Sequence, residues 1–106
     1  RGFELNLEHA LLDTGSAGTV LSVNKVLEIG MEVEPEDTVH QIRGVGGVEY
    51  VFLKRVDELI VDNLRVNNFD VEVGMMDYGF DLDAIIGMDF LVQVGAVIDL
   101  KQMEII

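Results

Sequence analysis

The amino-acid sequence predicts an all-β domain built from many short strands, and three observations support this prediction. Several short segments are rich in β-branched residues and are bounded by glycine-rich turns, a pattern typical of a closed β-barrel or a β-sandwich. Glycine is frequent, with 11 residues, and 49% of all residues are hydrophobic, which excludes a disordered or collagen-like chain. At 106 residues the chain has the length of a single domain, residues 1–106, with its own core.

The first part of the chain is expected to form strands around one short helix. Three strands are predicted before residue 22: Phe3–Leu7, His9–Asp13 and Thr19–Leu21. The first of them alternates apolar and polar side chains, as a half-buried strand does. Ser22 is suited to cap a helix over Val23–Ile29, and Gly30 is suited to end it.

The rest of the chain is expected to be mostly strand. Strands are predicted over Val39–Ile42, Val48–Val56, Leu59–Val61, Leu64–Val73 and Asp83–Ile86, followed by a last hairpin of Ala96–Leu100 and Met103–Ile106. Asp62-Asn63 has the composition of a two-residue turn. One or two helical turns are predicted over Met88–Val94, with Asp89 near the positive end of the helix dipole and Gly95 as the stop.

The chain is strongly acidic, with 20 Asp and Glu residues against 7 Lys and Arg residues and a net charge of −13. Nucleic acids and anionic membrane surfaces both attract cationic side chains, so neither partner is expected. No apolar run reaches the roughly 20 residues needed to span a bilayer. The chain has no cysteine, which excludes disulfides and thiolate zinc sites and is compatible with a cytoplasmic location.

No cofactor or metal site is expected. His9 and His40 are separated single histidines without cysteine partners, which is a poor basis for a metal site. Asp77, Asp81 and Asp83 lack the spacing and the trailing glutamate of a calcium loop, so we expect them to be solvated loop acids.

The segment Leu11–Ser16 ends an apolar run on an acid, a hydroxyl and a glycine. Because a charge is unfavourable to bury directly after such a run, we interpret Asp13 as a carboxylate held at the tip of a buried strand. Gly15 lets the backbone turn and leaves room for a substrate or another chain. A purely structural turn at the strand end is the alternative interpretation.

Two further segments stand out by their glycines. Ile42–Val48 is a glycine-rich hairpin tip between β-branched arms, which could also be no more than a tight turn. Ala84–Leu91 is a buried strand that turns through Gly87 into a short helix.

In this order the three segments resemble the retropepsin-like aspartic peptidases, the single-domain relatives of pepsin and the retroviral proteases. The resemblance extends from about Leu5 to Leu100, and its most specific part is Ile85–Gly95, with the pattern Ile-Ile-Gly-x-Asp-x-Leu-x-Gln-x-Gly. It implies a closed barrel of short strands with a flap hairpin and one or two short helices.

The resemblance assigns roles to the first segment. Asp13 matches the catalytic aspartate, and Thr14 matches the threonine that braces the active-site loops of two chains. Gly15 matches the glycine whose carbonyl faces a bound peptide. At the position of Ser16 a hydroxyl is able to hydrogen-bond the carboxylate and favour its ionised form.

The resemblance also implies a set of substrate-binding residues. They are Arg43, Gly44, Val45, Gly46, Gly47 and Ile85. The four residues from Gly44 to Gly47 match the flap tip that closes over substrate, and Arg43 stands where retroviral flaps have glycine. Val45 and Ile85 would line apolar side-chain pockets.

The chain departs from the retroviral pattern in its ion pairs and its end. Retroviral members pair an Asp four residues after the catalytic one with an Arg after the second glycine, and here these positions hold Ala17 and Met88. The ion pair that supports the retroviral dimer is therefore absent. The chain also continues past the usual last strand as Lys101–Ile106, so the dimer contact is expected to differ from interleaved retroviral ends.

A chain with one Asp-Thr-Gly segment supplies half of a catalytic pair of carboxylates. We therefore expect an aspartic endopeptidase that hydrolyses peptide or protein substrates as a homodimer, with Asp13 of each chain facing the other. Because two chains of charge −13 repel each other, dimerisation and activity are expected to increase with salt or at mildly acidic pH.

Two other functions are compatible with the sequence. The first is a catalytically weak or inactive domain of the same fold used for dimerisation or peptide binding, which Ala17 and Met88 leave open. The second is a processing or regulatory domain cut from a longer polypeptide, since the sequence starts at Arg1-Gly2 without an initiator methionine.

Overall fold

The computed structural model describes residues 4–32, 34–44, 47–76 and 82–106 of the chain. In chain order the elements are β1 (Ala10–Leu12), β2 (Val20–Ser22), α1 (Val23–Val26), the 3-10 helix η1 (Leu27–Ile29), β3 (Val39–Gly44), β4 (Gly47–Val61), β5 (Leu64–Gly74), β6 (Ala84–Ile86), α2 (Met88–Val94), β7 (Ile98–Asp99) and β8 (Glu104–Ile105).

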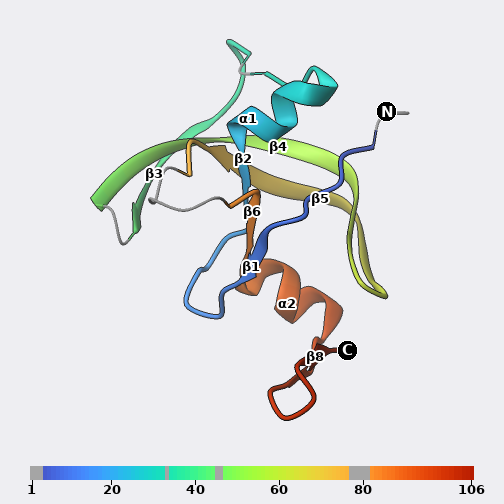
Figure 1. Ribbon diagram of the computed structural model, residues 1–106. Coiled ribbons are helices and arrows are strands. Elements are labelled where there is room, and N and C mark those ends of the chain that lie inside the picture. The colour runs from blue at the N-terminus through green and yellow to red at the C-terminus, as the bar shows by residue number, and fades with distance from the viewer. Residues whose placement is uncertain (1–3, 33, 45–46, 77–81) are drawn as a thin grey trace.

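Six of the strands form one sheet in the order β1-β6-β2-β5-β4-β3. The pairs β1–β6 and β2–β5 are parallel, whereas the other neighbours are antiparallel. The long strands β4 and β5 curve, so the sheet curls into a half-barrel (Figure 1). The prediction of an all-β fold with one or two short helices is confirmed, and the last hairpin is present as the separate pair β7–β8.

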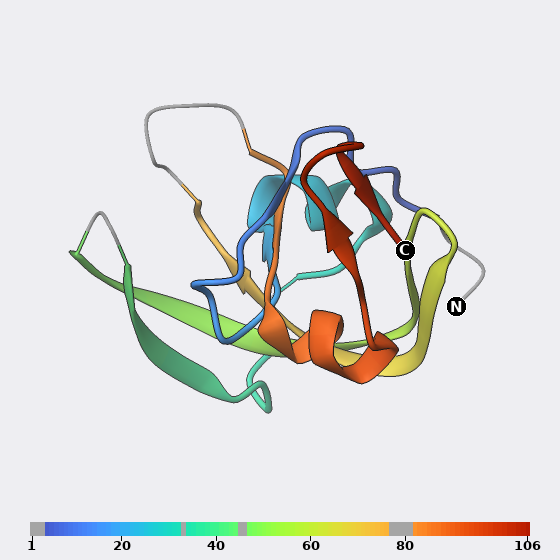
Figure 2. The same cartoon turned by 90° about the horizontal axis from the view of Figure 1, so that it is seen from below.

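The hydrophobic core lies on one face of this sheet and is covered by both helices. Its buried residues are Leu21, Val26, Phe52, Leu59, Val66, Phe69, Val71, Val73, Ala84, Ile86, Phe90 and Leu91. Phe90 of α2 packs edge to face against Phe69 of β5, with ring centroids 6.0 Å apart and an interplanar angle of 84°. This contact joins α2 to β5, beside which it lies in Figure 2.

The helices agree with their sequence signals to different degrees. α2 has the predicted bounds, and Gly95 ends it in the left-handed conformation at φ 64°. The helix predicted over Val23–Ile29 is divided into α1 and the 3-10 helix η1, and Gly30 ends it at φ 78°. Ser22 stands at the expected N-cap position, but its side chain makes no capping hydrogen bond.

Two strand predictions are corrected. β4 is continuous through the acidic Asp57-Glu58 dipeptide, because its pairing with β5 continues at Glu58, opposite Asn67. The predicted strand Phe3–Leu7 is wrong for residues 4–7, which form no strand. Leu5 and Leu7 nevertheless pack against the core, so the alternation reflects burial of side chains without pairing in the sheet.

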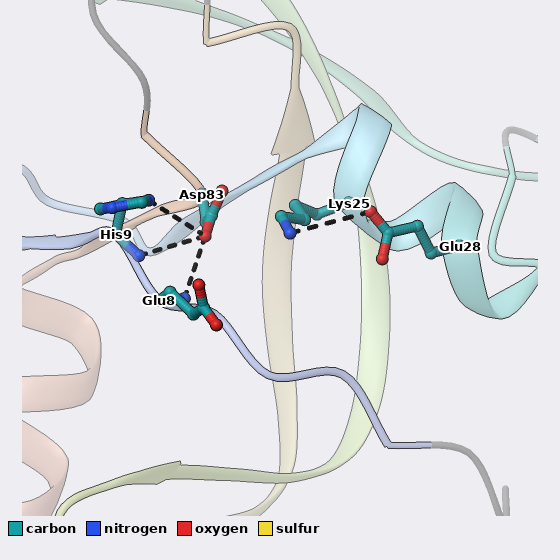
Figure 3. A network of polar contacts seen from close by, with 5 residues as sticks. All are labelled: Glu8, His9, Lys25, Glu28 and Asp83. Carbon is teal, nitrogen blue, oxygen red and sulfur yellow. Dashed lines mark hydrogen bonds and ion pairs between the residues drawn. The ribbon is translucent and has the colours of Figure 1, made fainter.

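Asp83 is not a solvated loop acid, in contrast to the prediction; Asp77 and Asp81 lie outside the described residues. Asp83 is 4% exposed, and its Oδ2 accepts hydrogen bonds from the backbone N–H of Glu8 at 2.9 Å and of His9 at 3.1 Å (Figure 3). Its backbone N–H also donates to the His9 carbonyl at 2.8 Å. This carboxylate therefore holds the segment that leads into β1 against the start of β6.

Among the helices of the described residues, none combines the length and the apolar character required to cross a membrane.

Candidate active site

Asp13 lies at the point where β1 ends. Its backbone N–H donates to the Ile86 carbonyl at 3.0 Å, which continues the parallel ladder between β1 and β6 by one residue. Its carboxylate Oδ1 accepts from the Gly15 N–H at 2.9 Å, and its carbonyl accepts from the Ser16 N–H at 3.1 Å. The half-buried side chain is thus fixed at a tight turn and remains accessible to solvent.

The loop that follows Asp13 rests on the junction between β6 and α2. The Met88 N–H donates to the Ser16 carbonyl at 2.8 Å, and the Asp89 N–H donates to the Ala17 carbonyl at 3.1 Å. β6 lies between β1 and β2, the two strands that this loop connects. The loop after Asp13 and the segment Ala84–Leu91 are therefore joined directly by backbone hydrogen bonds.

A buried polar network fixes the far end of the same loop. Thr19 is fully buried, and its hydroxyl donates to Asp89 Oδ1 at 2.7 Å while accepting from the Gly87 N–H at 3.1 Å. The Thr19 N–H donates to Asp89 Oδ2 at 3.2 Å. Asp89 thus ties the start of β2 to α2.

One side of the sheet carries Asp13. Leu11 of β1, Ile85 of β6, Val20 of β2 and Glu72 of β5 are register neighbours across four adjacent strands, so their side chains point to the same side. Asp13 is two residues beyond Leu11 and shares this side by strand alternation. We call this side the Asp13 face; it lies opposite the core.

The Asp13 face has a small apolar cluster of its own. Val20, Val51 and Met76 are buried in it, and Leu82 and Ile85 are packed against it. Ile85 is therefore placed on the strand next to β1, two strands from Glu72 in the sheet, where its side chain is able to form an apolar wall beside Asp13.

The other predicted residues of the Asp13 loop have separate positions. Thr14 and Gly15 are exposed, and Ser16 is half-buried. The Ser16 hydroxyl donates to the Gly18 carbonyl at 2.8 Å and not to the Asp13 carboxylate as expected. This bond stabilises the loop turn and leaves the Gly15 N–H as the donor to Asp13 Oδ1.

The predicted flap is a hairpin of β3 and β4. The two strands pair as far as Gly44 and Gly47, so the hairpin reaches the positions that the sequence indicates. Val45 and Gly46 lie outside the described residues, as does the side chain of Arg43. Their part in a substrate site therefore stays a prediction.

Reasoning from sequence missed three contributors to this region: Thr19, Gly18 and Glu72. Asp89 was expected to interact with the helix dipole, and the signal for its larger role was its place in the specific run Ile85–Gly95. Its partner Thr19 is 70 residues away in sequence, a contact that periodicity cannot reveal. Within the described residues there is no group of three or more side chains that could hold a metal ion.

The comparison with known families agrees with this geometry. A family model described as aspartyl protease matches residues 6–90, which include the Asp13 loop, the β3–β4 hairpin and the β6–α2 junction. No curated protein matches the chain. Because the family model covers most of the chain and the sheet has the curl and the loop arrangement that go with it, the protein belongs to the aspartyl protease family of retropepsin-like type.

Proposed function

We propose that the protein is an aspartic endopeptidase whose active site is completed by two copies of Asp13 in a homodimer. The observation that carries the proposal is the Asp13 carboxylate, which is held by the Gly15 N–H at the end of the edge strand β1 and still reaches solvent. The family model that matches the chain is described as aspartyl protease, which supports this activity. The Asp-Thr-Gly segment occurs once in the sequence, so one chain offers half of the required pair.

The chemistry needs two carboxyl groups that share one proton. Two carboxylates in contact do not ionise together easily, so one is protonated while the other is charged, as in other aspartic proteases. The charged carboxylate takes a proton from water while the water oxygen attacks the scissile carbonyl carbon. The protonated carboxyl gives its proton to the carbonyl oxygen. When the tetrahedral intermediate collapses, the carboxyl group that took the proton from water gives it to the amine nitrogen and the C–N bond breaks. The other carboxylate takes back a proton from a hydroxyl of the intermediate, which restores the starting pair.

The neighbouring residues then have positioning roles. In the dimer, the exposed Thr14 is available to brace the partner's loop, and the Gly15 carbonyl is available to a bound peptide. The β3–β4 hairpin, with its predicted tip at Gly44–Gly47, closes over the peptide and excludes water from the reaction.

The C-terminal hairpin provides a surface suited to the dimer contact. Its exposed apolar side chains are Val97, Ile98, Leu100, Met103 and Ile106. Leu100 is 78% exposed and Met103 is 85% exposed, which is unfavourable for large apolar side chains of a free monomer when they are clustered. The hairpin lies at the same end of the molecule as the Asp13 loop, opposite α1 (Figure 1), and the half-site at that end requires a second copy.

Cleavage of a peptide library tests the proposal. The wild type should hydrolyse internal peptide bonds, whereas Asp13→Asn should show no cleavage at either acidic or neutral pH. Asp62→Asn, which removes the same charge from an exposed turn, serves as the control and should cleave like the wild type. Cleavage that persists in Asp13→Asn contradicts the catalytic assignment.

The second candidate is a peptide-binding or dimerisation domain without significant hydrolysis. It is favoured by the replacement of the dimer-stabilising ion pair by Ala17 and Met88. Absence of cleavage by the wild type together with retained peptide binding would support this function.

A further inference from the structure

Glu72 places a carboxylate against the loop that follows Asp13. Its backbone N–H donates to the Thr19 carbonyl at 2.9 Å, and in the sheet it is the register neighbour of Val20. A Cβ added to Gly18 would lie 2.3 Å from Glu72 Oε1. The missing side chain of Gly18 therefore gives the Glu72 carboxylate its place over the active-site loop, on the Asp13 face.

The carboxylate of Glu72 has an incomplete set of partners. It is half-buried, and within the described part of the chain it makes neither an ion pair nor a hydrogen bond. By contrast, the other acids near this loop are satisfied, because Asp83 and Asp89 each accept bonds from backbone N–H groups. A partly desolvated anion without a partner is unfavourable, and a bound cation removes that disadvantage.

The electrostatic surroundings of Glu72 agree with this description. Burial raises the pKa of its carboxyl, the nearby Asp89 raises it further, and His40 on β3 acts in the opposite direction. The charged form of Glu72 is therefore less stable, relative to the protonated form, in the folded chain than in the unfolded chain. Residues with unfavourable environments of this kind are typical of binding sites.

We propose that Glu72 binds the lysine or arginine side chain of a peptide substrate and so makes the enzyme selective for cationic residues near the scissile bond. This inference rests on the proposed function for its assumption that peptides bind on the Asp13 face. The half-buried Ile85, in the same row as Glu72, is suited to pack against the aliphatic stem of such a side chain.

The sheet also limits where the cationic residue binds. β5 is the third strand from β1, and strands are spaced at about 4.8 Å, which gives roughly 14 Å between Glu72 and the strand that carries Asp13. An extended peptide advances about 3.4 Å per residue, so the recognised side chain lies within about four residues of the scissile bond.

Peptide pairs that differ only in lysine against glutamine at one position test the proposal. For the preferred position, the wild type should cleave the lysine peptide with a kcat/KM about tenfold higher than that of the glutamine peptide. In Glu72→Gln this ratio should fall to about one, with the loss on the lysine peptide. Glu58→Gln, which removes an equal charge from an exposed site on β4, should retain the wild-type ratio. An unchanged preference in Glu72→Gln overturns the proposal.

Binding measurements separate this inference from the proposed catalysis. In the Asp13→Asn background no hydrolysis is expected, and the affinity for the same peptide pairs can be compared with and without Glu72→Gln. A lysine preference that Glu72→Gln removes supports the inference, even if the wild type cleaves nothing and the proposed function fails. Equal affinities for both peptides, or no binding of either, overturn it.

Thermal unfolding of Glu72→Gln tests whether the variant is folded. Since the pKa of Glu72 is raised, its ionised form destabilises the fold at pH values above that pKa, and a neutral glutamine removes the effect. The Tm of Glu72→Gln at neutral pH should therefore equal or exceed that of the wild type. A lost lysine preference with an unchanged or higher Tm assigns the effect to recognition.

Discussion

Gly87 and Gly18 are in such close contact that a Cβ on Gly87 would lie 2.2 Å from the Gly18 carbonyl oxygen. The same Cβ would lie 2.9 Å from the Ser16 carbonyl oxygen. Because both neighbours are backbone atoms, they cannot move without displacing the Asp13 loop. The contact explains in physical terms why the turn after β6 requires glycine.

Replacing Gly87 by alanine is expected to disturb the active site as well as the fold. The forced shift of the backbone should lower the free energy of unfolding by about 3 kcal/mol and abolish peptide cleavage. Urea denaturation and cleavage assays measure both effects. The control is Gly30→Ala, which meets no atom within 4 Å but adopts φ 78°. It should lose about 1 to 2 kcal/mol and keep its activity. A stable, active Gly87→Ala would contradict the description of this contact.

Thr19→Val should destabilise the loop through its buried hydrogen bonds. The change leaves Asp89 Oδ1 without its hydroxyl donor and the Gly87 N–H without an acceptor, at an expected loss of about 2 to 4 kcal/mol. Thr19→Ser keeps the hydroxyl and should retain most of the stability and the activity. Thr38→Val, at an exposed position, controls for the change of side chain. Equal stabilities of Thr19→Val and Thr19→Ser would show that the network is not stabilising.

Asp83 should make the stability dependent on pH in the acidic range. Burial alone would raise its pKa, but the N–H groups of His9 and Glu8 and the nearby Lys25 and His9 side chains outweigh burial and lower it. An acid with a lowered pKa stabilises the fold above its unfolded pKa of about 3.9, and this contribution disappears as the pH falls through the folded value.

The variant Asp83→Asn tests this relation. At neutral pH it should be less stable than the wild type by about 2 to 4 kcal/mol, because two backbone donors lose a charged acceptor. The difference should narrow as the pH is lowered below about 4. Thermal unfolding across the pH range measures it, with Asp70→Asn as an exposed, ion-paired control that should change stability by at most about 1 kcal/mol. A difference that does not vary with pH would be evidence against the assigned role.

Dimerisation should increase with ionic strength. Each chain has a net charge of −13, and salt screens the repulsion between two such chains. Sedimentation should therefore show a shift from monomer to dimer as salt is added, with a parallel rise in activity. The paired change Leu100→Asn and Met103→Asn should weaken the dimer without unfolding the chain, since both side chains are largely exposed. An unchanged monomer–dimer balance from low to high salt contradicts the electrostatic part of this prediction.

Local sequence signals predicted the elements that depend on local chemistry. The end of α2 requires a residue in the left-handed conformation, and Gly95 is suited to it, so this end was recognisable. The β3–β4 hairpin was recognisable as well, because the sequence has glycines between two β-branched segments. The continuity of β4 was not, because pairing with β5 overrides the unfavourable dipeptide Asp57-Glu58.

The polar contacts around the site were beyond sequence reasoning for a different reason. Asp83 reaches the Glu8 N–H over 75 positions, and Asp89 reaches Thr19 over 70, so neither partner follows from the local pattern around the acid. The position of Glu72 likewise follows only from the register of β5 with β2 and from the space beside Gly18. Asp13 was identifiable because its own segment carries the pattern.

Mixing the wild type with Asp13→Asn at constant total protein concentration tests most directly whether two Asp13 residues form one active site. If both chains of a dimer must supply Asp13, activity follows the square of the wild-type fraction, and an equal mixture should retain about one quarter of the wild-type activity once the chains have exchanged. A mixture that retains half of the activity, in linear proportion to the wild-type fraction, would contradict the shared active site.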